Sequence, residues 1–166
     1  MDLNKIKKWT HAGVIVLHEH STDCLILTKR SEHLRRHPGE VCFPGGVWEE
    51  GDENFYATAL RELREELGID SSRVSLIKEL TREQTLLGSV IHPWLAAIDS
   101  IVPFHINDSE VASLISLPLA VVKNPKNYQE ILVERSGFKF KSWQFIGHSE
   151  FIWGATARIM RQLIDW

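Results

Sequence analysis

The stretch ALRELREELGID, residues 59–70, is typical of an amphipathic helix with an unusual charge pattern. Glu62, Glu65 and Glu66 are spaced at i, i+3 and i+4, so their carboxylates share one stripe of the helix. Like charges at this spacing repel one another by roughly 0.2–0.5 kcal/mol per pair. The stripe is therefore either a solvated face that arginines of the same helix neutralise, or a binding site for cations.

The helix is predicted from Glu53 to Leu67, because its apolar residues recur with helical spacing. Gly68 follows it and suits the left-handed conformation that ends many helices. The apolar positions fall together on one side of the helix, and they are Tyr56, Leu60, Leu63 and Leu67. The three glutamates lie well away from this side, so they are not expected to fill the core.

Length and composition predict a single globular domain spanning residues 1–166. Hydrophobic residues make up 43% of the chain and charged residues 25%, which are ordinary proportions for such a domain. A formal net charge of −3 argues against a protein that coats nucleic acid, which would need a basic surplus. We therefore expect no nucleic-acid partner.

A membrane association is not expected either, because no run reaches the ~20 apolar residues that cross a bilayer. The N-terminus is unlike a signal peptide, since its apolar run is short and is interrupted by His18 and Glu19. Cys24 and Cys42 lie within apolar runs and are interpreted as reduced core residues. These features predict a cytoplasmic protein.

Short β-rich runs alternate with turns along most of the chain. The predicted strands are a hairpin of residues 12–19 and 23–30, a brief strand at 40–43 before a Pro-Gly-Gly turn, two strands at 74–80 and 89–99, and a hairpin of 128–134 and 138–145. Residues 106–124 combine turn residues with a short helix, and residues 151–166 have helical periodicity. Strands flanked by two helices predict an α/β fold with a mixed sheet covered by helices.

The loop before the glutamate helix, FPGGVWEEGDE at residues 43–53, combines a turn of little side-chain bulk at Gly45 and Gly46 with four acids. Hard divalent cations such as Mg²⁺ prefer carboxylate and carbonyl oxygens. The turn at Gly45 and Gly46 would let a backbone carbonyl approach such an ion, and the glutamate stripe would supply the remaining ligands. Such ions bind phosphate oxygens, neutralise developing charge and activate a water nucleophile. The residues therefore indicate a Mg²⁺-dependent hydrolase of a phosphate compound.

The same segment resembles the Nudix box, G-x(5)-E-x(7)-R-E-U-x-E-E-x-G-U, in which U is a bulky aliphatic residue. The second half matches in full, at Arg61, Glu62, Leu63, Glu65, Glu66, Gly68 and Ile69. In the first half, Glu53 has the seven-residue spacing to Arg61, but six residues rather than five separate it from Gly46. Either the loop is one residue longer, or Asp52 takes the role of the first acid.

A second resemblance covers residues 26–46, ILTKRSEHLRRHPGEVCFPGG. One Nudix subfamily, the coenzyme A diphosphatases, carries L-L-T-x-R-S-x(3)-R-x(3)-G-x(3)-F-P-G-G and typically shows the longer loop with an aspartate before the helix. Here only the first Leu is replaced, by Ile26, and the matching positions are Thr28, Arg30, Ser31, Arg35, Gly39, Phe43, Pro44, Gly45 and Gly46. The resemblance implies the Nudix fold, an α/β/α sandwich with a mixed β-sheet.

The resemblance also implies the roles of the box residues. Glu62, Glu65 and Glu66 are expected to bind Mg²⁺ or Mn²⁺, with the carbonyl of Gly46 as a further ligand. Arg61 is expected to pair with a carboxylate of the loop or helix and so to orient it.

Two catalytic roles stay open. The first box acid is either Glu53 or Asp52, and the general base is Glu65, Glu66 or the distant Glu110. Acids in the first turn also favour the helix by themselves.

The substrate-binding residues are expected to be Arg30, Arg35, Gly45 and Gly46. Guanidinium groups recognise phosphate with two parallel hydrogen bonds, so the two arginines could clamp a highly anionic substrate, or they could pair with nearby acids on the surface. The partner is thus expected to be a small nucleotide derivative, and dimerisation stays open.

The implied reaction is hydrolysis of the diphosphate of coenzyme A or acyl-coenzyme A to 3′,5′-ADP and 4′-phosphopantetheine or its acyl form. One alternative is a Nudix pyrophosphatase for ADP-ribose, NADH or oxidised nucleoside triphosphates. Another is a Nudix module that binds a ligand without turnover.

Overall fold

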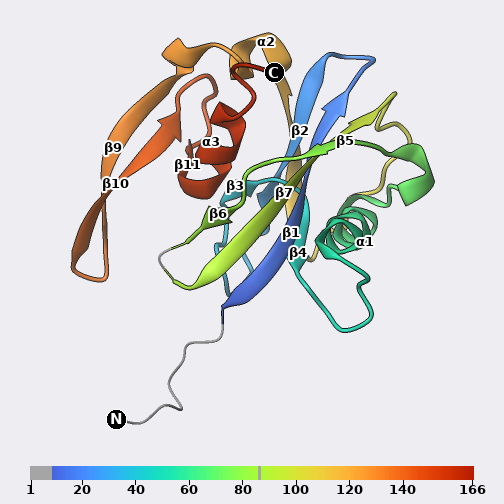
Figure 1. Cartoon of the computed structure of the whole chain (residues 1–166), viewed down its shortest axis with the longest axis horizontal. Helices are drawn as coiled ribbons and strands as arrows, with labels where there is room; N and C mark the ends of the chain where they lie inside the picture. Colours follow the sequence, from blue (N-terminus) through green and yellow to red (C-terminus); the bar gives the residue numbers. More distant parts are fainter. Residues whose placement is uncertain (1–8, 86) are drawn as a thin grey trace.

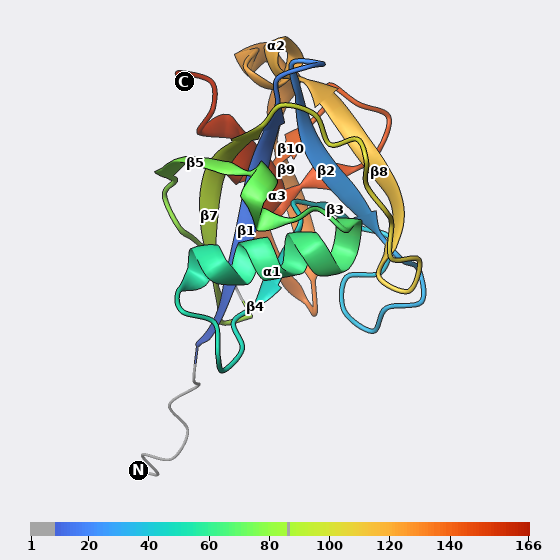
Figure 2. The ribbon, with the colours of Figure 1, turned by 90° about the vertical axis from the view of Figure 1, so that its right-hand side faces the viewer.

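A computed structural model describes residues 9–85 and 87–166 and shows three layers (Figure 1). A mixed sheet of eight strands forms the middle layer. Helix α1, Phe55–Leu67, packs on one face of this sheet, as Figure 2 shows. Helix α3, Gly154–Arg161, and a second sheet of three strands pack on the other face. The predicted α/β/α sandwich with a mixed sheet is confirmed, and the three-stranded sheet is an addition to it.

The central sheet is built on two long strands, β1 at Thr10–Glu19 and β7 at Ser89–Ile98, which pair in parallel along their whole length. The other edge of β1 is shared. Its end forms a hairpin with β2, Cys24–Arg30, and its first half pairs with β4, Gly45–Val47. The remaining strands of this sheet are β3 Val41–Cys42, β5 Ser75–Glu79, β6 Glu83–Gln84 and β8 Val111–Pro118.

Alternation along β1 supplies both faces of the sheet with core residues, as a period of two requires. Ile15 and Leu17 are fully buried beneath α1, together with its Leu63. Val16 points to the opposite face and packs in the larger cluster that includes Met160 of α3. Strand β1 is thus buried on both faces, and it fixes the position of α1 and of the segments around it.

The second sheet consists of β9, Tyr128–Arg135, β10, Phe138–Phe145, and the short β11, Ile152–Trp153, in the order β11-β10-β9. The hairpin of β9 and β10 occurs where the sequence predicts it. Buried Tyr128, Phe145 and Ile152 join this sheet to the larger core cluster.

The remaining helical segments are short: η2 at Ser71–Arg73 and η3 at Pro125–Asn127 are 3-10 turns, and α2 is Leu119–Val122. Within residues 9–85 and 87–166, no helix is long and apolar enough to cross a membrane.

Several predicted boundaries differ from the observed ones. The Pro-Gly-Gly segment, predicted as a turn, continues as strand β4, because its backbone pairs with β1. Residues 106–124 contain the eight-residue strand β8 and only one turn of helix, because the edge of β2 offers a pairing partner. Helix α3 is shorter than the predicted 151–166.

The two cysteines are free thiols in the structure. Both are half-buried, so the prediction that they are core residues holds only in part. Burial raises the pKa of the Cys42 thiol to about 11, and the neighbouring Glu66 charge acts in the same direction. At neutral pH this thiol is therefore protonated and a poor nucleophile.

Candidate active site

The residues that cap α1 fix where the helix begins and ends, and therefore which of its side chains face the loop that precedes it. The Asn54 side chain accepts a hydrogen bond from the backbone N–H of Ala57 at 2.8 Å, so the helix begins at Phe55 and not at the predicted Glu53. Gly68 ends it with φ 65°, a conformation that favours glycine.

Three carboxylates converge beside α1. Glu62 and Glu66 come from successive turns of the helix, and Glu110 comes from the loop before β8. One carboxylate oxygen of each lies within 4.8 Å of the others. Glu66 is only 6% exposed, and its Oε2 atom is buried without a hydrogen-bond partner among the described residues. A buried polar atom normally has a partner, so this oxygen is free to accept a ligand.

Burial and mutual repulsion raise the pKa of both helix carboxyls. The pKa of Glu66 rises to about 8, chiefly through burial and then through the charges of Glu62 and Glu110. The pKa of Glu62 rises to about 7, again chiefly through burial and then through the charge of Glu65. The cluster therefore holds more negative charge than its surroundings neutralise, and a cation would relieve it.

Strand β4 brings glycine backbone against this cluster. A Cβ atom at Gly46 would lie 2.5 Å from the Cδ atom of Glu62, so any larger residue there would push this carboxylate out of its place. The backbone of Gly45 donates a hydrogen bond to the Glu66 carboxylate. A Cβ atom at Gly45 would overlap the carbonyl oxygen of Gly13 on β1. Both glycines thus lie where the sequence analysis places them, beside the acidic stripe.

Arg61 joins the loop to the helix. Its Nε and Nη2 atoms donate to the two oxygens of Asp52 at 2.9 and 3.0 Å. Its Nη1 atom lies 3.1 Å from Glu62 and 3.3 Å from Glu65. The guanidinium holds the pKa of Asp52 well below its usual range, and hydrogen bonds from the Glu49 backbone and Thr58 act in the same direction. Arg61 therefore contacts acids of both the loop and the helix.

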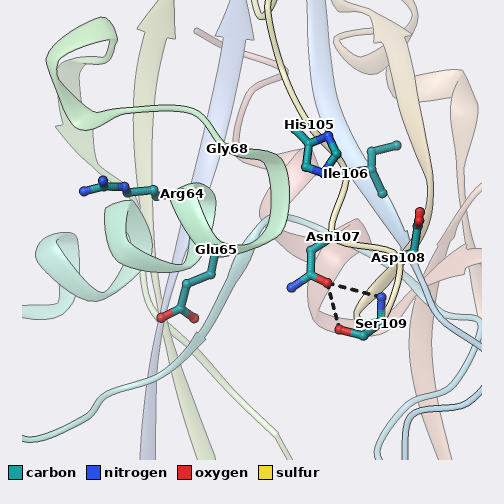
Figure 3. A pocket seen from close by; sticks show the side chains of 8 residues that line it. All are labelled: Arg64, Glu65, Gly68, His105, Ile106, Asn107, Asp108 and Ser109. Carbon is teal, nitrogen blue, oxygen red and sulfur yellow. Dashed lines mark hydrogen bonds between the residues drawn. The ribbon is translucent and has the colours of Figure 1, made fainter.

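Glu65 lies outside the three-carboxylate cluster, although the sequence analysis counts it among the metal ligands. Its side chain is 47% exposed and pairs with Arg61. It borders a groove of about 490 Å³ between α1 and residues 105–109. Figure 3 shows Glu65 on the helix side of this groove and Asn107 on the loop side.

The two predicted phosphate-binding arginines have different surroundings. The guanidinium of Arg30 donates two hydrogen bonds, at 3.0 and 3.3 Å, to the backbone carbonyl of Arg36, so it shapes the loop between β2 and β3. Arg35 is exposed and makes no hydrogen bond or ion pair with the described residues. Arg35 is thus the better placed of the two to meet an anion.

Comparison with known proteins identifies the family. The sequence model of the NUDIX domain matches residues 7–131, three quarters of the chain. A relative from Yersinia pestis (strain Pestoides F), named "Uncharacterized Nudix hydrolase NudL", is 36% identical over 139 residues, which cover 84% of this chain and 70% of the relative. The chain belongs to the Nudix hydrolase family.

Solved structures share the Nudix fold of this chain. A protein of Deinococcus radiodurans superposes with a TM-score of 0.63 at 18% identity and covers 98% of this chain and 89% of its own. The NUDIX domain of Shewanella oneidensis NrtR, solved with ADP ribose, superposes with a TM-score of 0.56 at 24% identity. It covers 74% of this chain and 80% of its own. At these identities the likeness concerns the fold alone.

The geometry shows how the Nudix box accommodates its extra residue. The acid bound to Arg61 is Asp52, and the side chain of Glu53 is exposed and makes no hydrogen bond or ion pair with the described residues. Five residues separate Gly46 from Asp52, as the box requires, so the extra residue lies between the acid and Arg61. Of the two candidates for the first box acid, Asp52 is thus the one with both the box spacing from Gly46 and the contact with Arg61.

Alanine substitutions at Asp52 and Glu53 test which of the two acids supports Arg61. Asp52→Ala should lower the free energy of unfolding at pH 7 by about 3 kcal/mol, because it leaves the half-buried Arg61 without its main partner. Because the folded pKa of Asp52 is depressed, its contribution is present above the ordinary value of 3.8 and is lost as the pH falls below it. Urea unfolding at pH 7 and pH 3 measures both effects. Glu53→Ala is the matched control, and an equal loss in that variant would contradict the assignment.

The cluster fits a divalent cation by the chemistry of its donors. Carboxylate oxygens on two turns of one helix, with glycine backbone beside them, are hard ligands of the kind that Mg²⁺ and Mn²⁺ accept. The unpartnered Oε2 atom of Glu66 supplies a second, independent reason. Sequence reasoning names Glu110 only as a candidate base, because no local pattern connects a residue 44 positions beyond Glu66 to the helix.

Proposed function

We propose that this Nudix hydrolase cleaves the diphosphate of coenzyme A or acyl-coenzyme A and uses Mg²⁺ or Mn²⁺. The products would be 3′,5′-ADP and 4′-phosphopantetheine or its acyl form. The observation that carries the substrate assignment is the agreement of residues 26–46 with the coenzyme A diphosphatase signature. The buried acidic cluster supports the metal dependence.

The proposal gives each acid of the site a separate task. Glu62, Glu66 and Glu110 would hold the metal, and the carbonyl of Gly46 would be a further ligand, since the Gly46 backbone runs close to Glu62. When bound, the ion would neutralise charge on the diphosphate and lower the pKa of water. Glu65 lies outside the cluster and borders the open groove, so it is the carboxylate best placed to accept a proton from water.

The arginines and glycines would govern positioning. Arg61, fixed by Asp52, holds Glu62 and Glu65 in place from one side. Arg35, exposed in the signature loop, would bind substrate phosphates, while Arg30 would support that loop through the carbonyl of Arg36.

Product analysis tests the substrate. Coenzyme A, acetyl-coenzyme A, ADP-ribose, NADH and deoxynucleoside triphosphates would each be incubated with the chain and Mg²⁺ or Mn²⁺, and the products identified by mass spectrometry. We expect the highest kcat/KM for a coenzyme A compound, with 3′,5′-ADP as a product. A preference for ADP-ribose would favour the other Nudix pyrophosphatases, and binding without turnover of any compound would indicate a non-catalytic module.

Two neighbouring arginines provide a matched pair for the same assay. Arg35→Ala should raise KM for coenzyme A about tenfold, because a charge-assisted hydrogen bond to phosphate is lost. Arg36→Ala removes an equal charge at the next position and should leave KM within about twofold. Equal effects would show that the loop acts only through its overall charge.

A further inference from the structure

The loop that carries Glu110 is held together largely by one residue, Asn107. The carbonyl oxygen of Asn107 accepts hydrogen bonds from the backbone N–H groups of Glu110 at 3.0 Å and Val111 at 2.9 Å. The backbone N–H of Asn107 donates to the carbonyl oxygen of Glu66 at 2.9 Å. A single residue thus connects the helix turn of one clustered glutamate to the backbone of another.

The side chain of Asn107 closes the same turn. Its Oδ1 atom accepts hydrogen bonds from the backbone N–H of Ser109 at 3.2 Å and from the Ser109 hydroxyl at 2.7 Å (Figure 3). Asparagine is well suited to this arrangement, because its short side chain reaches the backbone two residues further along. The turn from Asn107 to Glu110 is therefore fixed at both its backbone and its side chain.

Few other contacts hold this segment. Asp108 and Ser109 are exposed, and the Glu110 side chain makes no hydrogen bond with the described residues. The backbone of Glu110 has one further anchor, since its carbonyl oxygen accepts a hydrogen bond from the N–H of Ser31 at 2.9 Å. The position of the Glu110 carboxylate thus depends on its backbone, and that backbone is held by the turn on one side and by Ser31 on the other.

We propose that Asn107 is a positioning residue for the metal site: its turn holds Glu110 within reach of Glu62 and Glu66. This inference rests on the proposed metal dependence of the cluster. Residues that orient metal ligands typically change metal affinity by about 10- to 100-fold when they are replaced. Asn107 would act through Glu110 and need not touch the ion.

Manganese binding measures this role without any substrate. The electron paramagnetic resonance signal of free Mn²⁺ would be followed during titration of the wild-type chain and its variants. Asn107→Ala should weaken Mn²⁺ binding about tenfold, because Ser109 loses its side-chain acceptor and the turn, left with its backbone hydrogen bonds alone, holds Glu110 less firmly. Asn107→Asp keeps the acceptor oxygen and should bind Mn²⁺ at least as well as the wild type.

Asn124 offers a matched control. Its Oδ1 atom accepts a hydrogen bond from the backbone N–H of Lys126 at 3.0 Å, the same kind of turn, at the start of η3. Asn124→Ala should therefore cost similar stability in a thermal melt and leave Mn²⁺ affinity unchanged. Equal weakening by Asn124→Ala and Asn107→Ala would overturn the inference, because it would show a general loss of stability.

Glu66→Gln and Glu110→Gln distinguish this inference from the proposed function. If both weaken Mn²⁺ binding while Asn107→Ala binds like the wild type, the metal site stands and the role of Asn107 is wrong. If Glu110→Gln has no effect, Glu110 is not a ligand and the inference also fails. If the wild-type chain binds no Mn²⁺, the metal site and the proposed function fail together. Weakening by Asn107→Ala with rescue by Asn107→Asp supports the inference.

Discussion

Glu66→Gln should lower the turnover number about a thousandfold and leave the chain folded. Glutamine has the size of glutamate, so the fully packed neighbours Leu63 and Leu67 need not move. It lacks the second carboxylate oxygen, which in Glu66 is buried without a partner and is the strongest indication of a bound cation. Steady-state kinetics with coenzyme A and Mg²⁺ would measure the loss.

The same variant should show the opposite effect on stability when no metal is added. Because burial raises the folded pKa of Glu66 to about 8, from an ordinary 4.5, its ionisation destabilises the native state as the pH rises through this interval. The neutral amide removes that cost, so the metal-free variant should melt no lower than the wild type at pH 7.

Added Mg²⁺ should affect the stability of the wild type and of Glu66→Gln differently. It should raise the melting temperature of the wild type, because a ligand that binds only the native state stabilises it, and should not raise that of Glu66→Gln. Glu130→Gln, an exposed site on β9, is the inert control. Near-normal turnover of Glu66→Gln would remove this carboxylate from the metal site.

The parts of the site that sequence reasoning predicted are local. The glutamate stripe follows from the period of the helix, because it depends only on residues within two helical turns. The contact of Arg61 with an acid was expected from the resemblance to the Nudix box, which is also a local pattern. The choice between Asp52 and Glu53 could not be made this way, because it depends on where Asn54 caps the helix.

The burial of Glu66 could not be predicted from the sequence either. Helical periodicity places it away from the apolar side, but Glu66 is among the buried residues of α1, with Ala59 and Leu63. Backbone of β4 and of the loop before β8 covers this part of the helix. Glu110 arrives there because β8 pairs with β2, a contact between segments roughly 90 residues apart in sequence, which no local pattern encodes.

Gly13→Ala should destabilise the chain by about 3 kcal/mol, because β1 and the first residue of α1 are in backbone contact at this point. A Cβ atom there would overlap the carbonyl oxygen of Phe55 and would lie 3.2 Å from the backbone nitrogen of Ala59. Backbone atoms of a capped helix cannot rotate away as a side chain can, so α1 would have to shift off the sheet. For a chain of this length the melting temperature should fall by about 10 °C.

The shift would also reach the acidic cluster, because Gly13 pairs with Gly46 across β1 and β4. Displacement of α1 would change the distance between Glu62 and the Gly46 backbone, so metal affinity should fall along with stability. Gly137→Ala is the control: a Cβ atom there meets nothing within 4 Å, and its positive φ of 79° should cost only about 1 kcal/mol. If Gly13→Ala melts no lower than Gly137→Ala, the helix is not held against β1 as closely as the structure indicates, and the approach of Glu62 to Gly46 would lose its support.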